Sequence, residues 1–146
     1  KIALPDRQVI SVVGDGGFMF GQTDSLWTMS RYNIPVMTVV FNNHSYEETR
    51  WNIMGQKGPA GLAGRDYVSY LGNPDVDFTR LASAYNIPGA VVKNTDELAG
   101  AIKQGLRTLA EGRPFLLDVH TRRIGIGSNV TEYQKYSVAD ERARKI

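Results

Sequence analysis

Residues 8–17 read QVISVVGDGG, and residues 36–43 read VMTVVFNN. Each stretch begins with a short run rich in β-branched residues and ends in glycine or polar residues. Apolar runs without alternation are typical of strands buried in a parallel sheet. We therefore predict buried strands over 8–13 and 36–41, with a glycine turn over 14–17 after the first strand.

The rest of the chain extends this pattern. Apolar residues at helical spacing, with Asp77 and either Asn94 or Thr95 as capping residues, indicate helices after both positions. The further predicted elements are helices over 23–32 (burying Leu26, Trp27 and Met29), 46–54, 77–85 and from 94 or 95 up to Gly112, and strands over 90–92 and 115–119. Strands that alternate with helices predict an α/β fold of three layers, a parallel sheet with helices on both faces.

Length and composition limit the classes of protein. The 146 residues, with 42% hydrophobic and 22% charged, suffice for one domain, which we expect over 1–121, followed by a polar tail over 122–146. The net charge of +2 gives no reason to expect nucleic-acid binding, and no apolar run is long enough for a membrane span. The absence of cysteine excludes disulfides and thiolate chemistry and fits a cytoplasmic protein. Glycine and proline mark a long loop over 55–74.

The glycine turn has three interpretations. A dinucleotide fingerprint begins with Gly14 and Gly16 but fails where its third glycine would be Met19. A phosphate loop of the Walker type lacks its lysine, which Gln22 replaces. The third interpretation also explains Asp15: a divalent cation bridges this carboxylate to a bound diphosphate.

Asparagine oxygens at the next strand end strengthen this third interpretation. Ligands of open α/β sheets bind at the carboxyl ends of strands, where Asp15 and the pair Asn42-Asn43 are both expected. Mg²⁺ takes about six oxygen ligands, which a carboxylate, an amide, a backbone carbonyl, a diphosphate and water can supply. Glycines without Cβ atoms let backbone N–H groups approach the phosphate oxygens.

Gly14-Asp15-Gly16, followed after twenty-five residues by Asn42-Asn43 at a strand end, resembles the thiamine-diphosphate-binding motif. The stretches VVGDGGFMF, RYNIPV and VVFNNHSY are similar to the acetolactate synthase and benzoylformate decarboxylase group, and the resemblance covers residues 5–119. It implies that thiamine diphosphate and Mg²⁺ are the cofactors. The full-length protein would be a 2-keto acid decarboxylase or carboligase, hence a lyase or transferase.

The resemblance also implies roles for single residues. Asp15 and Asn43 would bind Mg²⁺ through their side chains, and Ser45 through its backbone carbonyl. Asn42 would support the loop by hydrogen bonds. The diphosphate would be contacted by Gly14, Gly16 and Gly17 through the backbone and by the adjacent Tyr46. Gly17 replaces a serine found in many relatives, and Ser45 a glycine, so the carbonyl ligand requires backbone angles that suit a non-glycine residue.

The chain carries no candidate for the glutamate that activates the cofactor in this family, so we expect no catalytic residue here. That glutamate belongs to a pyrimidine-binding domain of the same or a partner chain. The chain begins with Lys1, and we expect it to be an inactive fragment of a protein several times longer, forming a homodimer or homotetramer. The alternatives are a flavodoxin-like phosphate- or nucleotide-binding module without catalysis, and a natural small subunit of a two-chain thiamine enzyme.

Other conspicuous side chains are expected to play no part in the chemistry. We predict that His44 and His120 are solvated histidines and that Glu47 and Glu48 lie on a solvated helix face. Trp27 and Trp51 are expected to serve packing.

Overall fold

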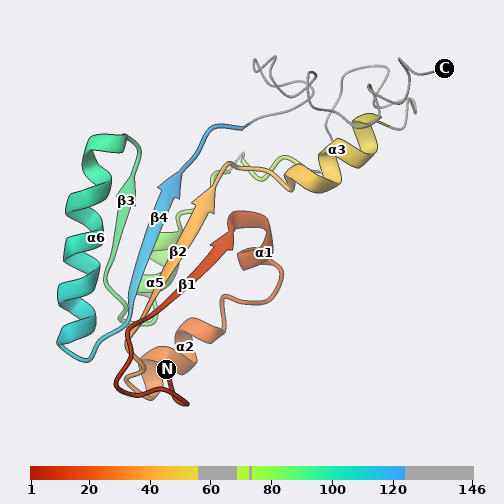
Figure 1. The fold of residues 1–146 in the computed structure, drawn as a ribbon. Helices are drawn as coiled ribbons and strands as arrows, with labels where there is room; N and C mark the ends of the chain where they lie inside the picture. Colours follow the sequence, from red (N-terminus) through yellow and green to blue (C-terminus); the bar gives the residue numbers. More distant parts are fainter. Residues whose placement is uncertain (56–68, 73, 124–146) are drawn as a thin grey trace, which may run out of the picture. The chain divides into compact units, whose positions relative to one another are not determined.

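The computed structural model describes residues 1–55, 69–72 and 74–123, with backbone alone for Ile53 and Met54. Its centre is a four-stranded parallel sheet in the order β1-β2-β4-β3 (Figure 1). The strands are β1 (Val9–Gly14), β2 (Val36–Asn42), β3 (Gly89–Val92) and β4 (Phe115–His120). The parallel sheet predicted from the sequence is confirmed.

Helices lie on both faces of this sheet. They are α1 (Asp15–Met19), α2 (Ser25–Arg31), α5 (Phe78–Ser83) and α6 (Thr95–Ala110). On one face the α6 side chains Leu98, Ile102, Leu106 and Leu109 pack with strand residues such as Met37 and Leu117. On the other face α1, α2 and α5 contribute Phe18, Leu26, Phe78 and Ala82 to a core with Val40 and Leu116. This arrangement is the expected three-layer α/β fold.

The chain divides into two compact units, which are described separately. Unit 1 comprises Lys1–Asn43 and Asp75–Thr121 and contains the sheet. Unit 2 comprises His44–Pro74 and Arg122–Ile146 and contains α3 (Glu47–Gly55), which confirms the helix predicted over 46–54. Most of the predicted loop over 55–74, and the predicted tail from residue 124 onward, lie outside the described residues.

The predicted glycine turn over 14–17 is wrong. Strand β1 continues through Gly14, whose backbone is extended, and α1 begins directly at Asp15. Phe18 explains the helical path, because its side chain is 1% exposed and anchors this short helix in the core. The helix predicted over 23–32 is confirmed as α2, but its Trp27 is 53% exposed and not a core residue.

The prediction of β1 as a buried strand is also wrong. Ile10 and Val12 of β1 are 48% and 61% exposed. Within the described residues β1 is an edge strand, paired with β2 along one side. Burial of an apolar run depends on its place in the strand order, which the run itself does not encode.

The caps of the two later helices confirm the sequence analysis. The side chain of Asp77 accepts a hydrogen bond from the backbone N–H of Arg80, and this bond is the main cause that lowers the pKa of Asp77. At α6, Asn94 and Glu97 form a reciprocal capping box. None of the helices in the described ranges is long and apolar enough to cross a membrane.

Candidate cation and diphosphate site

Asp15 lies at the exit of β1, beside the end of β2. The register pairs Gly14 with Phe41, so the residues that follow in the two strands leave the sheet at the same edge. The Asp15 side chain is buried, and its Oδ1 accepts a hydrogen bond from the backbone N–H of Gly16 at 2.8 Å. Hydrogen bonds compensate a buried carboxylate for its lost hydration, and a divalent cation is another partner of the kind that a carboxylate accepts.

Gly14 precedes this carboxylate in an exposed position at the end of β1. Its φ of −77° and ψ of 155° are open to any residue, so its backbone conformation does not require glycine. A Cβ atom added at Gly14 would meet no atom within 4 Å, and one at Gly17 would make an ordinary contact with Val13 at 3.4 Å. Neither packing within the described residues nor the backbone conformation therefore requires a glycine at position 14, which is exposed.

Asn42 ends β2 in a buried position, with 1% of its surface exposed. Its Nδ2 donates a hydrogen bond to Asp118 Oδ2 over 3.5 Å, and its backbone oxygen accepts one from the N–H of Thr121 over 2.7 Å. These bonds agree with the supporting role expected for Asn42. Asn43 follows directly and is half-buried at the point where the chain leaves the strand.

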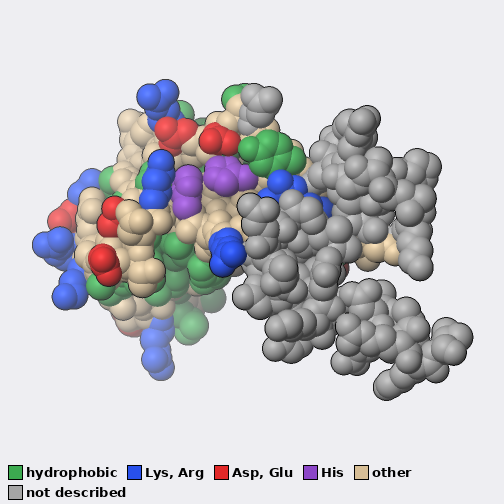
Figure 2. All heavy atoms as spheres, turned by 90° about the horizontal axis from the view of Figure 1, so that it is seen from above, with side chains coloured by type: hydrophobic (Ala, Val, Ile, Leu, Met, Phe, Trp, Pro, Cys, Tyr) green, Lys and Arg blue, Asp and Glu red, His purple; other side chains and the backbone are tan. Residues whose placement is uncertain are grey.

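Asp118 and His120 were not recognised as part of this region from the sequence. The Asp118 side chain is 2% exposed, and its Oδ2 lies 3.5 Å from His120 Nε2. His120 is partly exposed, and Figure 2, which looks onto the end of the sheet toward which the strands run, shows histidine on that surface. The acidic residue inside the apolar run FLLDV was the available signal.

Ser45 and Tyr46 belong to unit 2, where a short backbone pairing holds them. Ser45 is buried and forms an antiparallel bridge with Tyr70. The backbone N–H of Tyr46 donates to the Ser69 oxygen, and that of Leu71 to the His44 oxygen, each over 2.8 Å. The left-handed conformation in this turn falls on His44, with φ 55°, and not on Ser45. The serine is therefore compatible with a carbonyl ligand.

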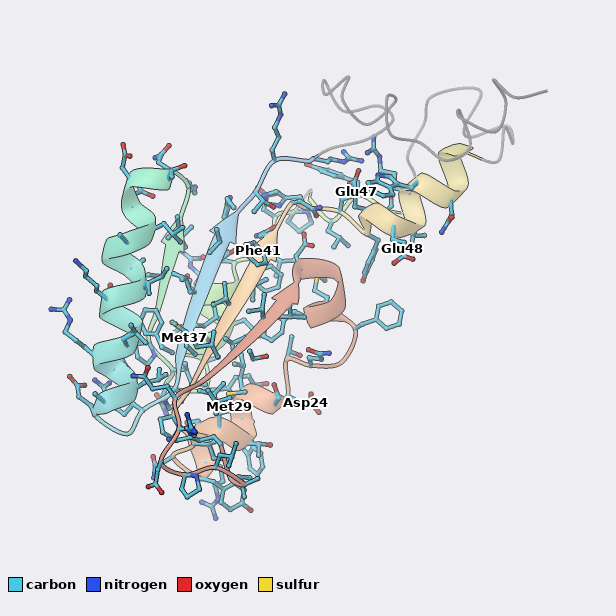
Figure 3. All side chains as sticks on the ribbon, viewed as in Figure 1. Asp24, Met29, Met37, Phe41, Glu47 and Glu48 are labelled. Carbon is cyan, nitrogen blue, oxygen red and sulfur yellow. The ribbon has the colours of Figure 1, made fainter. Side chains whose placement is uncertain are left out.

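The prediction that Glu47 lies on a solvated face is wrong. Its Oε1 accepts hydrogen bonds from Arg50 Nη1 at 2.9 Å and Trp51 Nε1 at 3.0 Å. Its Oε2 lies 4.0 Å from Arg123 Nε, and the Arg123 guanidinium stacks over the Tyr70 ring. Glu48 is exposed as expected, and Figure 3 shows the two side chains leaving α3 in different directions. Neighbouring residues of a helix point about 100° apart, which explains their different surroundings.

The donors present restrict the ions that this region can bind. Within the described residues, no three histidine, aspartate or glutamate side chains gather as a metal centre. A cation at the strand ends would rely on one carboxylate, an amide, a backbone carbonyl and oxygens of a ligand. Such an all-oxygen set suits Mg²⁺ or Ca²⁺ and is poorly suited to metals that prefer imidazole or thiolate.

Fold and site together define a class: a parallel α/β domain that presents oxygen donors at the carboxyl ends of neighbouring strands, beside open space at a glycine. Residues 1–119 match the family described as "Thiamine pyrophosphate enzyme, C-terminal TPP binding domain". The chain belongs to this family, as the sequence motif indicated.

Individual relatives agree with this assignment. The chain is 32% identical over 124 residues to benzoylformate decarboxylase of Pseudomonas aeruginosa, covering 85% of this chain and 21% of the relative. It is 30% identical over 119 residues to acetolactate synthase of Bacillus subtilis, covering 82% and 19%. Among solved structures, a thiamine diphosphate-dependent 4-hydroxybenzoylformate decarboxylase of Rhodococcus jostii matches with a TM-score of 0.68 and 31% identity, over 84% of this chain and 21% of that one. The chain thus spans about a fifth of the length of these relatives.

Proposed function

We propose that this chain binds the diphosphate of thiamine diphosphate through a Mg²⁺ ion. Asp15 and Asn43 would bind the ion through their side chains, and Ser45 through its backbone carbonyl. The observation that carries the proposal is the buried Asp15 carboxylate beside Gly14, a glycine that neither conformation nor packing requires.

Charge balance supports these roles. A diphosphate and a buried carboxylate repel one another unless a divalent cation lies between them, because like charges interact strongly where water is excluded. The backbone at Gly14, Gly16 and Gly17 and the side chain of Tyr46 would contact the phosphate oxygens, and the Gly16 N–H would give up its bond to Asp15 Oδ1 to do so. We propose that Asn42, which β4 holds through its Nδ2 and its backbone oxygen, supports the site.

For the full-length protein we propose a decarboxylase or carboligase acting on a small 2-keto acid. The bound cofactor supplies the electron sink for the bond-breaking step. The residues described here anchor the diphosphate and carry no group that would activate the cofactor, so a glutamate of a pyrimidine-binding domain is assigned that task. We propose a homodimer or homotetramer in the cytoplasm, and no catalysis by residues 1–146 alone.

The test is a titration with thiamine diphosphate in the presence and absence of Mg²⁺, followed by calorimetry, for the wild-type protein and Asp15→Ala. We expect binding by the wild type with Mg²⁺ and a loss of affinity of at least about 100-fold for the variant, because the charged ligand is removed. Asp24→Ala, an exposed acidic residue at the start of α2, is the matched control and should bind as the wild type does. Equal affinity of the wild type and Asp15→Ala would overturn the assignment.

A further inference from the structure

Asp118 is an acidic residue inside an otherwise apolar strand. In β4 it lies opposite Val40 of β2, on the sheet face where the neighbouring Leu116 is fully buried in the core. The Asp118 side chain is itself 2% exposed. Replacing buried charged residues with apolar ones often leaves the stability of a protein unchanged or raises it. Packing alone therefore gives no reason for an aspartate at this position.

The partners of this carboxylate point to its purpose. Asp118 Oδ2 lies 3.5 Å from Asn42 Nδ2 and 3.5 Å from His120 Nε2. The hydrogen bond to Asn42 joins residues 76 positions apart in the sequence. At 3.5 Å this is a long hydrogen bond, and it ties the Asn42 amide to the neighbouring strand.

Strand β4 holds Asn42 at two points. Asp118 contacts its side chain, and the backbone N–H of Thr121 donates to its carbonyl oxygen. Asn42 is the last residue of β2, so its orientation sets the direction in which the chain continues to Asn43. A displacement at Asn42 is therefore transmitted to the next side chain, the amide that we assign to the cation.

We infer that Asp118 is a positioning residue for the cation site: it fixes the Asn42 amide and thereby aims Asn43 at the ion. This inference rests on the proposed function. Asp118 touches neither cation nor cofactor in this account. It acts on the ligand through one intervening residue, as the outer partners of metal ligands do.

The experiment measures metal affinity and not turnover. In the protein at its full natural length, with thiamine diphosphate saturating, the dissociation constants of Mg²⁺ and Ca²⁺ are determined for the wild type, Asp118→Asn, Asp118→Glu and Asp15→Ala. Asp96→Asn, at an exposed position on α6, is the control for the loss of one negative charge. The unfolding temperature of each variant without metal and cofactor is recorded alongside.

We expect Asp118→Asn to weaken Mg²⁺ binding by about 10- to 100-fold, the usual effect of changing an outer partner of a ligand. Ca²⁺ tolerates irregular geometry, whereas Mg²⁺ demands a nearly ideal octahedron, so the ratio of Mg²⁺ to Ca²⁺ affinity should fall. Asp118→Glu should restore part of that ratio, and Asp96→Asn should leave it unchanged. The unfolding temperature without ligands should not follow the loss of Mg²⁺ affinity.

The outcomes separate the two proposals. If the wild type binds thiamine diphosphate equally with and without Mg²⁺, and as well as Asp15→Ala does, the proposed function fails and the role of Asp118 fails with it. If Asp15→Ala loses binding while Asp118→Asn keeps the wild-type metal constants, the role of Asp118 alone is refuted. Equal losses of Mg²⁺ and Ca²⁺ affinity together with a lower unfolding temperature would also refute it. Should Asp118→Asn not fold, the Mg²⁺ to Ca²⁺ ratio of Asp118→Glu decides: a changed ratio supports the role, and an unchanged ratio contradicts it.

Discussion

The exits of β1 and β2 supply the proposed cation ligands in different ways. After β1 the chain continues at once into α1, where Asp15 accepts a hydrogen bond from the adjacent Gly16 and Phe18 packs in the core edge-on to Phe78. After β2 the position of Asn42 is set by Asp118 and Thr121, which lie far along the sequence. The hydrogen bond of Asp15 at the first exit joins adjacent residues, whereas those of Asn42 at the second exit join residues far apart in the sequence.

This difference has a consequence for how the site forms. Short-range contacts can form before the sheet is complete, whereas contacts between distant residues pay the cost of closing a long loop first. The hydrogen bond at the β1 exit should therefore tolerate changes elsewhere in the fold better than the hydrogen bonds at the β2 exit. Substitutions at Asn42, Gly14, Asp77 and His44, each with a control or contrasting variant, probe this comparison.

The largest effect is expected at the β2 exit. Asn42→Ala should lower the free energy of unfolding by about 1–3 kcal/mol, because it removes the hydrogen bond between Asn42 and the buried Asp118 carboxyl group. Asn43→Ala, at the half-buried next position, should cost less than about 1 kcal/mol and is the control. Urea unfolding measures both. Combining Asn42→Ala with Asp118→Asn should recover part of the loss, and strict additivity would contradict the contact.

At the β1 exit, Gly14→Val should change the free energy of unfolding by less than about 1 kcal/mol, since valine fits an extended strand and meets open space. The same change should weaken thiamine diphosphate binding by at least about tenfold, or about 1.4 kcal/mol, by occupying the space of the ligand. Gly105→Ala on α6 is the contrasting case. Its Cβ would lie 2.6 Å from Met37 Sδ and 2.9 Å from Phe115 Cδ1, so it should destabilise the fold by about 1–3 kcal/mol. An unchanged affinity of Gly14→Val for thiamine diphosphate would show that the ligand does not occupy the space beside Gly14.

Asp77 tests a contact between residues three positions apart. Asp77→Ala should lower the free energy of unfolding by about 1 kcal/mol through loss of the helix cap, while Asp77→Asn, which keeps an acceptor, should lower it by a few tenths.

The pH dependence of this cap has a defined sign. The backbone N–H of Arg80 holds the pKa of Asp77 below its usual range, so the folded state favours the charged form. The added stability is present above the ordinary pKa of about 4 and is lost as the pH falls through the lowered value. The difference between wild type and Asp77→Asn in urea unfolding should therefore be constant near neutrality and shrink in acid. A difference that grows in acid would contradict the assigned cause.

The smallest effect is expected at His44. Glycine adopts a φ of 55° without a steric cost, although it loses more chain entropy on folding than histidine does. The net effect of His44→Gly should be a rise of about 0.5–1 kcal/mol in the free energy of unfolding. Asn86→Gly, at φ 60°, should gain less because asparagine tolerates this conformation. Thermal unfolding compares the two, and a destabilised His44→Gly would mean that contacts of the imidazole outweigh the backbone cost.

The same distinction decides what could be predicted from the sequence. The caps of α5 and α6 and the apolar stripe of α6 are local signals, and all were confirmed. The edge position of β1 and the exposure of Trp27 depend on the order of strands and the placement of helices, which local patterns do not contain. The glycine-rich stretch was expected as a turn because its composition favours one, yet the burial of Phe18 imposed a helix.

The site shows the same division. The motif around Asp15 and Asn43 led to the family, which residues 1–119 confirm. The contact between Asn42 and Asp118 could not be predicted, because nothing in either local sequence indicates which strand lies beside β2. The solvated position predicted for Glu47 is wrong because the pair Glu47-Glu48 does not indicate that Arg50, Trp51 and Arg123 surround the first of these residues. The ligand roles of Asp15, Asn43 and Ser45 remain predictions.

The most direct test of the central claim is the coupling between Mg²⁺ and thiamine diphosphate. A cation that bridges Asp15 to the diphosphate must raise the affinity for the cofactor, and the cofactor must raise the affinity for the cation by the same factor. Calorimetric titrations in both orders should give equal factors for the wild type and a factor close to one for Asp15→Asn. Thiamine diphosphate binding that is equally tight in the wild type when all divalent cations are chelated would contradict the account.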